Sequence, residues 1–62
     1  MKITFAVDPE NIIAFADILA SEELKNEIQG STEEDLLLID VHYSKDKQEA
    51  LESLEDLAES DD

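Results

Sequence analysis

The spacing of apolar residues changes along this 62-residue chain from every second residue to every third or fourth, and then back again. Alternation at Ile3, Phe5 and Val7 predicts a half-buried strand over residues 2–7. A second alternating run predicts a strand over residues 36–43. Helical spacing lies between and after these runs, so we expect a single small α+β domain over residues 1–62.

The first helix is expected over residues 9–20. Asp8 can accept a hydrogen bond as the N-cap, and Pro9 fits the first helical position because its fixed φ suits a helix. The apolar positions of this segment repeat with helical spacing and should face the core: Ile12, Phe15, Ala16 and Leu19.

The helical pattern then changes phase near Ser21. A straight continuation would place Glu23 and Glu27 on the buried side, where unpaired carboxylates are strongly unfavourable. We therefore expect a break at Ser21, followed by a second short helix that Leu24 and Ile28 anchor and Gly30 ends.

The last helix is expected over residues 45–59, with Ser44 as its cap and an apolar stripe on one side. The predicted order is β-α-(α)-β-α, with the final residues Asp61 and Asp62 frayed. Because two strands make a poor sheet, we expect a dimer that shares one sheet across a two-fold axis. Leu36 and Leu38 give the second strand an apolar patch on its other face, which a partner subunit could cover.

Charge bears most directly on function, since 18 acidic residues stand against four lysines and the net charge is −14. A phosphate backbone binds cations, so direct nucleic-acid binding is excluded, and an anionic lipid surface would repel the chain. An apolar content of 42% with clear periodicity is not typical of a disordered chain. We expect a folded protein that binds a cationic protein.

Two groups of acidic residues are the candidate partner-binding residues. At about 100° per residue, five of them share one outward face of the last predicted helix. These carboxylates repel one another, and Glu55, Asp56 and Glu59 lie at the negative end of the helix, which suggests that they serve a purpose beyond solubility. The alternative is an ordinary solvated helix face with an acidic tail. The two groups are Glu49, Glu52, Glu55, Asp56 and Glu59 on the helix, and Glu33, Glu34 and Asp35 in the loop before the second strand.

Other kinds of chemistry find little support in the sequence. There is no cysteine for a disulfide, a thiolate zinc site or a nucleophile, and His42 is the only histidine. The carboxylates match no calcium-binding loop, and a single glycine excludes a phosphate-binding loop. We expect no enzyme activity, no cofactor and no metal. No apolar stretch follows a basic segment, so a cytoplasmic protein is expected.

In composition, this small, cysteine-free, strongly acidic α/β chain resembles the DNA-mimic inhibitors that bacteriophages and mobile elements encode. The resemblance covers no alignable stretch. Such proteins target restriction enzymes, uracil-DNA glycosylase, nucleoid proteins or CRISPR effector complexes. It implies an inhibitor that occupies the basic channel of a nucleic-acid-binding protein, with an anti-CRISPR role favoured. The alternative is a small regulatory or structural dimerisation domain whose charge serves only solubility.

Overall fold

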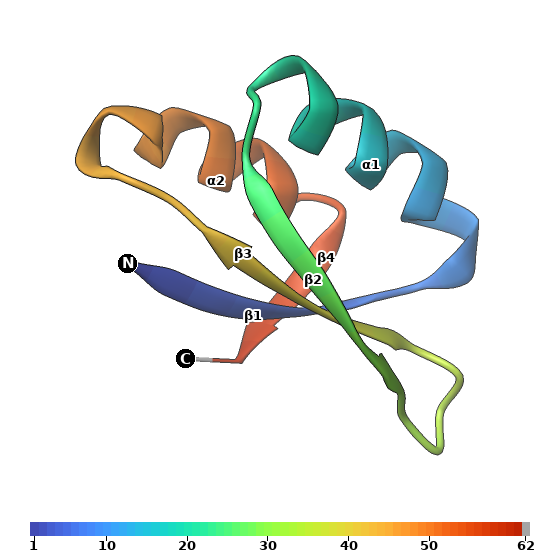
Figure 1. The fold of residues 1–62 in the computed structure, drawn as a ribbon. Helices are drawn as coiled ribbons and strands as arrows, with labels where there is room; N and C mark the ends of the chain where they lie inside the picture. The colour runs from blue at the N-terminus through green and yellow to red at the C-terminus, as the bar shows by residue number, and fades with distance from the viewer. Residues whose placement is uncertain (62) are drawn as a thin grey trace.

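The computed structural model describes the backbone of residues 1–61 and the side chains of residues 1–58. Four strands and two helices follow one another in the order βαββαβ, and a short 3₁₀ turn leads into each helix (Figure 1). The elements are β1 (Lys2–Val7), η1 (Pro9–Asn11), α1 (Ile12–Ser21), β2 (Lys25–Ser31), β3 (Leu37–His42), η2 (Lys45–Lys47), α2 (Gln48–Glu55) and β4 (Ala58–Asp61).

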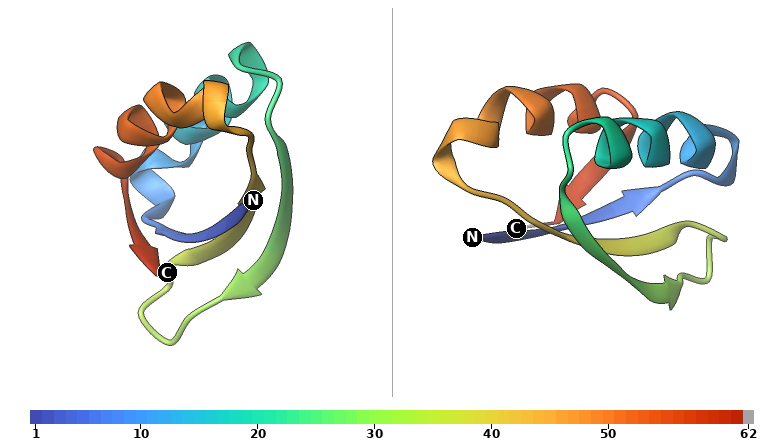
Figure 2. Two further views of the ribbon diagram at one scale, coloured as in Figure 1. Left: turned by 90° about the vertical axis from the view of Figure 1, so that its left-hand side faces the viewer. Right: turned by 45° about the horizontal axis from the view of Figure 1, so that its top comes forward.

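The strands form one antiparallel sheet in the order β2-β3-β1-β4. β1 pairs with β3 along its whole length, while β4 pairs with the second half of β1. This connectivity is the split βαβ arrangement called ferredoxin-like. Both helices lie on one face of the sheet (Figure 2), so the predicted α+β class is confirmed.

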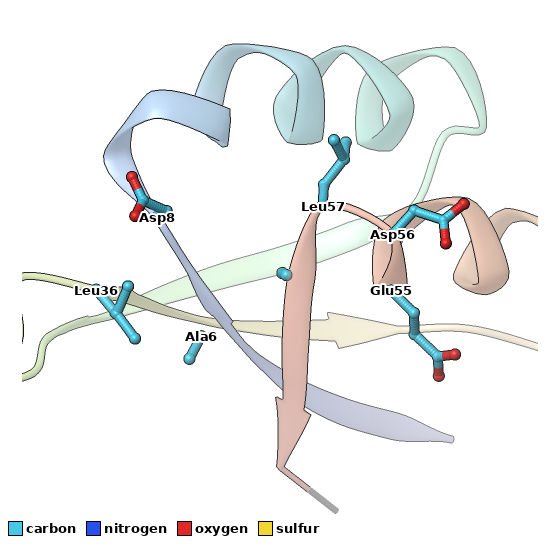
Figure 3. Close-up of a pocket in the computed structure, with 7 residues that line it drawn as sticks. Ala6, Asp8, Leu36, Glu55, Asp56 and Leu57 are labelled. Carbon is cyan, nitrogen blue, oxygen red and sulfur yellow. The ribbon is translucent and has the colours of Figure 1, made fainter.

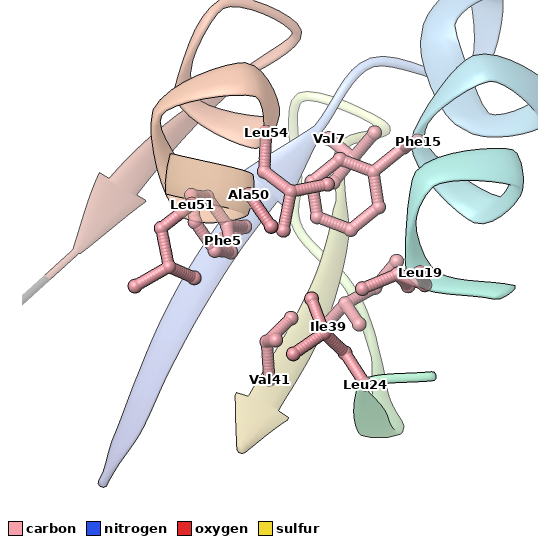
Figure 4. Packing of buried hydrophobic residues seen from close by; sticks show 10 residues of the cluster. All are labelled: Phe5, Val7, Phe15, Leu19, Leu24, Ile39, Val41, Ala50, Leu51 and Leu54. Atoms are coloured by element: carbon pink, nitrogen blue, oxygen red, sulfur yellow. The ribbon is translucent and has the colours of Figure 1, made fainter. Parts of the chain in front are cut away.

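The core fills the space between the helices and the sheet (Figure 4). Phe5 of β1 meets Phe15 of α1 edge to face, with ring centroids 5.3 Å apart. Phe5 and Val7 of the first predicted strand are buried as expected, whereas Ala16 is exposed on the flank of α1. The buried apolar residues are Phe5, Val7, Phe15, Leu19, Leu24, Ile39, Val41, Ala50, Leu51 and Leu54.

The predicted break after Ser21 is confirmed. Glu23 adopts a left-handed conformation with φ of 55°, and its N–H donates to the carbonyl of Ala20 at 3.2 Å. The N–H of Leu24 reaches back to the carbonyl of Leu19 at 2.9 Å, and both of these side chains are buried. These contacts form a Schellman-type C-cap, which turns the chain away from the helix axis.

The predicted second short helix is wrong, because the segment after this cap is strand β2. Antiparallel pairing with β3 satisfies the backbone groups on one edge of this segment and joins it to the sheet, whereas a short isolated helix is only marginally stable. Gly30 does not end a helix. It has a φ of 146° beside an irregularity in the register between Ile28 and Gly30, which a glycine accommodates readily.

The predicted end of the last helix is also wrong. α2 ends at Glu55, the N–H of Leu57 turns back to the carbonyl of Leu54 at 3.0 Å, and β4 begins at Ala58 opposite Val7. Acidic residues are unfavourable at the negative end of a helix, so these residues disfavour a longer α2. As a strand, the segment instead pairs with the edge of β1 that would otherwise be open.

A sheet shared between two subunits stays a prediction. It was predicted because two strands make a poor sheet and Leu36 and Leu38 needed a cover. One chain, however, supplies four strands and already half-buries Leu36 and Leu38. The fraying predicted for Asp61 and Asp62 also stays a prediction, and Asp62 lies outside the described residues. No helical stretch in the described part of the chain has the length and apolar composition required to cross a bilayer.

Candidate functional site

α2 enters through the 3₁₀ turn that follows Ser44. Ser44 is the predicted cap, but its hydroxyl donates to the carboxylate of Asp46 and accepts no hydrogen bond from a helix N–H. This hydrogen bond lowers the pKa of Asp46, and the backbone N–H of Asp46 and the charge of Lys47 act in the same direction. Asp46 thus remains ionised at the positive end of the helix, where a negative charge is favourable.

Four of the five predicted helix carboxylates are exposed together along α2 and its last turn: Glu49, Glu52, Glu55 and Asp56. Asp56 lies just past the helix end, yet its N–H still donates to the carbonyl of Glu52 at 3.3 Å. The turn is therefore still helical, and the backbone positions of Glu52 and Asp56 lie about 6 Å apart along the axis.

Glu59 does not belong to this helical row, which corrects the sequence-based assignment. Its backbone is part of β4, where it pairs with Ala6 of β1. The apolar periodicity does not reveal this strand, because Leu57 and Ala58 have the spacing of the helix stripe although the chain turns before them.

The second acidic group occupies the turn between β2 and β3. Thr32 organises this turn, since its hydroxyl accepts hydrogen bonds from the N–H groups of Glu34 and Leu36, both at 3.2 Å. The N–H of Asp35 donates to the carbonyl of Thr32 at 3.0 Å. Asp35 has a φ of 63°, which an aspartate tolerates better than most residues. The side chains of Glu33, Glu34 and Asp35 are all exposed.

A hollow of about 320 Å³ lies beside the end of α2 (Figure 3). Glu55 and Asp56 lie on one side of it and Asp8 on another. Leu36, which directly follows the acidic turn, also lines the hollow. Its remaining lining is apolar: Ala6, Leu57 and Ala58. Folding therefore places Asp8 around the same hollow as Glu55 and Asp56, which lie far from it in the sequence.

All four lysines lie at the opposite end of the molecule. Lys2 of β1 and Lys25 of β2 are both paired with His42, at the end of β3. Lys45 and Lys47 follow directly, in the turn before α2. We call this the lysine end, and we call the other the acidic end: Asp8, Glu33, Glu34, Asp35, Glu52, Glu55 and Asp56.

Nearby carboxylates partly offset the charges at the lysine end. The Nζ of Lys47 lies 3.7 Å from a carboxylate oxygen of Glu22, and the Nζ of Lys2 lies 3.9 Å from a carboxylate oxygen of Asp40. The sequence carries a signal of this separation, since Lys2 and Lys25 begin strands and Lys45 and Lys47 begin the last helix. Only the strand register shows that these lysines lie together, and β2 was not predicted to be a strand.

The uncovered face of the sheet contains a hydrogen-bonded polar cluster around Asp40, which is only 8% exposed. Thr4 donates to one carboxylate oxygen at 2.6 Å, and the amide of Gln29 donates to the other at 3.0 Å. These bonds satisfy the buried carboxylate, so the cluster is structural. Within the described residues, no three acidic or histidine side chains converge in a way that could hold a metal ion.

Comparison of the chain with protein-family models, with curated proteins and with solved structures finds no match.

Proposed function

We propose that this protein binds a cationic, nucleic-acid-binding protein through its acidic end and blocks the channel that normally holds the nucleic acid. The observation that carries the proposal is the separation of charge. The lysines gather at one end, while the acidic end combines Asp8, which follows β1, with the carboxylates of the β2–β3 turn and of α2 and its last turn.

The acidic end has the properties that a mimic of a phosphate backbone requires. Its carboxylates are exposed, and the turns that present them are fixed by hydrogen bonds that the hydroxyl of Thr32 and the carbonyl of Glu52 accept from backbone N–H groups. An ionised carboxylate can accept two parallel hydrogen bonds from an arginine, as a phosphate does. Positions about 6 Å apart on the helix allow adjacent cationic side chains to be engaged at once.

The strong negative charge should also attract the partner at long range, before the two proteins touch. A lysine-free acidic end on a chain of net charge −14 attracts and orients a cationic surface, which accelerates association at low ionic strength. A CRISPR effector is the target class that we favour, and a restriction enzyme or another nuclease would present the same chemistry.

Competition with nucleic acid tests this proposal. The immobilised protein is exposed to a bacterial lysate at low salt, and bound proteins are then challenged with a DNA or RNA oligonucleotide. We expect the oligonucleotide to release the captured protein, because both ligands occupy one channel. A captured protein that stays bound at saturating oligonucleotide would contradict mimicry.

The rival function is a dimerisation domain that binds through apolar surface, and Ile13 and Ile28 are indeed 75% and 66% exposed. A salt titration separates the two functions. Apolar binding should survive about 0.5 M salt, where the screening length is only about 4–5 Å, whereas binding through the acidic end should weaken markedly.

A further inference from the structure

The free edge of β2 is the surface that the proposed function leaves unused. Among the described residues, β2 pairs with β3 alone, and all seven of its residues are exposed. A long edge strand without proline offers a row of backbone groups to which another extended chain can pair.

The ladder shows which backbone groups of β3 point toward β2. Tyr43 and Met1 exchange two hydrogen bonds, at 2.8 and 2.9 Å, so the backbone groups of Tyr43 point toward β1. Since the direction alternates along a strand, the groups of His42, Asp40 and Leu38 point toward β2. The N–H of Thr32 donates to the carbonyl of Leu36 at 2.8 Å, so the backbone of Leu36, two residues before Leu38, is also directed toward the β2 side.

The outward-directed groups of β2 follow from this pattern. Lys25 and Glu27 pair with His42 and Asp40, so their own N–H and C=O groups are used within the sheet. Asn26 and Ile28 alternate with them and direct their backbone groups away from the molecule. These groups are open to a partner.

Apolar surface accompanies this edge. Ile28 is paired with the buried Ile39, on the face that the helices cover, yet it remains 66% exposed at the edge. On α1, helical geometry groups Ile13 with the exposed Ala16 and Ala20 on one flank. The amide of Asn11 bonds the carbonyl of Leu57 on the α2 side of α1, so the apolar flank lies on the other side, toward β2.

We propose that β2 receives an extended, cationic segment of the target protein as an added strand, in which basic and apolar residues alternate. This rests on the proposed function. The apolar residues would lie beside Ile28, and the basic residues would lie beside Glu27 and the carboxylates of the β2–β3 turn. Charge favours this occupant over a second copy of the chain, because two copies would bring together two molecules of net charge −14.

Two synthetic octapeptides test the proposal: one of alternating lysine and valine, and one of four lysines and four prolines in the order Lys-Lys-Pro-Pro-Lys-Lys-Pro-Pro. Their charge is equal, but the proline pairs remove N–H groups from both edges of the second peptide, so neither edge can pair continuously with β2. We expect the lysine–valine peptide to bind at least about tenfold more tightly, because only this peptide can add backbone hydrogen bonds. It should also slow hydrogen exchange at the amides of Asn26 and Ile28.

Asn26→Pro supplies the matched variant. It removes an outward N–H without breaking the pairing with β3, so the fold should be retained, whereas Asn26→Ala removes only the side chain. Circular dichroism confirms the fold of both variants. We expect Asn26→Pro to abolish the preference for the lysine–valine peptide, and Asn26→Ala to keep it.

The possible failures are distinguishable. Equal binding of both peptides, unaffected by Asn26→Pro, would overturn the added strand and leave the acidic end in place. Absence of binding by either peptide at low salt would count against the proposed function as well. Concentration-dependent protection of Asn26 and Ile28 without any peptide would show that a second copy occupies the edge, which also overturns the proposal.

Discussion

The hydroxyl of Thr4 donates a 2.6 Å hydrogen bond to the carboxylate of Asp40, across the pair of strands at the centre of the sheet. This contact lies on the face without helices, where Asp40 is nevertheless buried. Gln29 on β2 bonds the second carboxylate oxygen, so one acidic side chain ties β1, β3 and β2 together.

Thr4→Val is expected to destabilise the fold by about 1–3 kcal/mol, because a buried carboxylate oxygen loses its donor while shape and strand propensity are kept. Urea unfolding followed by circular dichroism measures the change. Thr4→Ser keeps a hydroxyl and should lose clearly less. An unchanged stability in Thr4→Val, or a larger loss in Thr4→Ser than in Thr4→Val, would contradict a stabilising role for this hydrogen bond.

Glu23→Gly is expected to stabilise the protein by about 0.5–1 kcal/mol. The left-handed conformation at this C-cap disfavours a side chain by about 1–2 kcal/mol, and the greater freedom of glycine in the unfolded chain offsets part of the gain. Thermal unfolding measures the effect. Ala20→Gly, inside α1, is the control and should instead destabilise by about 1 kcal/mol. A loss of stability in Glu23→Gly would contradict the described cap.

The two helices and two of the strands could be predicted from the sequence, because their apolar residues repeat with one period over several turns or pleats. Phe5, Phe15 and Leu54 are typical of this success. β2 could not be predicted, since Leu24 and Ile28 have helical spacing and Gly30 resembles a helix end. Its strand conformation depends on pairing with β3, which is tertiary information.

The same limit applies to the candidate site. The carboxylates of the turn and of α2 were predicted individually, and all except Glu59 have the expected local setting. The approach of Glu55 and Asp56 to Asp8 around one hollow depends on β4, which brings the end of α2 back to β1. No local pattern at Leu57 or Ala58 reports that pairing.

Ser44→Ala is expected to raise the pKa of Asp46 toward its ordinary value of 3.8, since the serine hydroxyl is the main cause of the lowered pKa. Because the pKa of this group is lower in the folded state, its stabilising effect is present above pH 3.8 and is lost as the pH falls through the folded value. An NMR titration of the Asp46 carboxyl carbon measures this pKa in the wild type and in Ser44→Ala. An unchanged midpoint would contradict the hydrogen bond.

Glu52→Lys with Asp56→Lys is expected to stabilise the fold by about 1 kcal/mol at low salt. Each change places a cation near the negative end of α2, which contributes about 0.3–1 kcal/mol and also relieves repulsion between carboxylates. Urea unfolding at low and high salt measures this, and the gain should shrink as salt screens the charges. A decrease in stability would show that these acids support the fold.

The same double variant tests the central claim most directly, through its affinity for the captured cationic protein at low salt. Its control is Asp17→Lys with Glu23→Lys, which changes the net charge equally at exposed positions outside the acidic end. We expect the acidic-end variant to bind at least about tenfold more weakly than the wild type, and the control to lose far less. Equal losses in the two variants, or no loss in either, would contradict the assignment of binding to the acidic end.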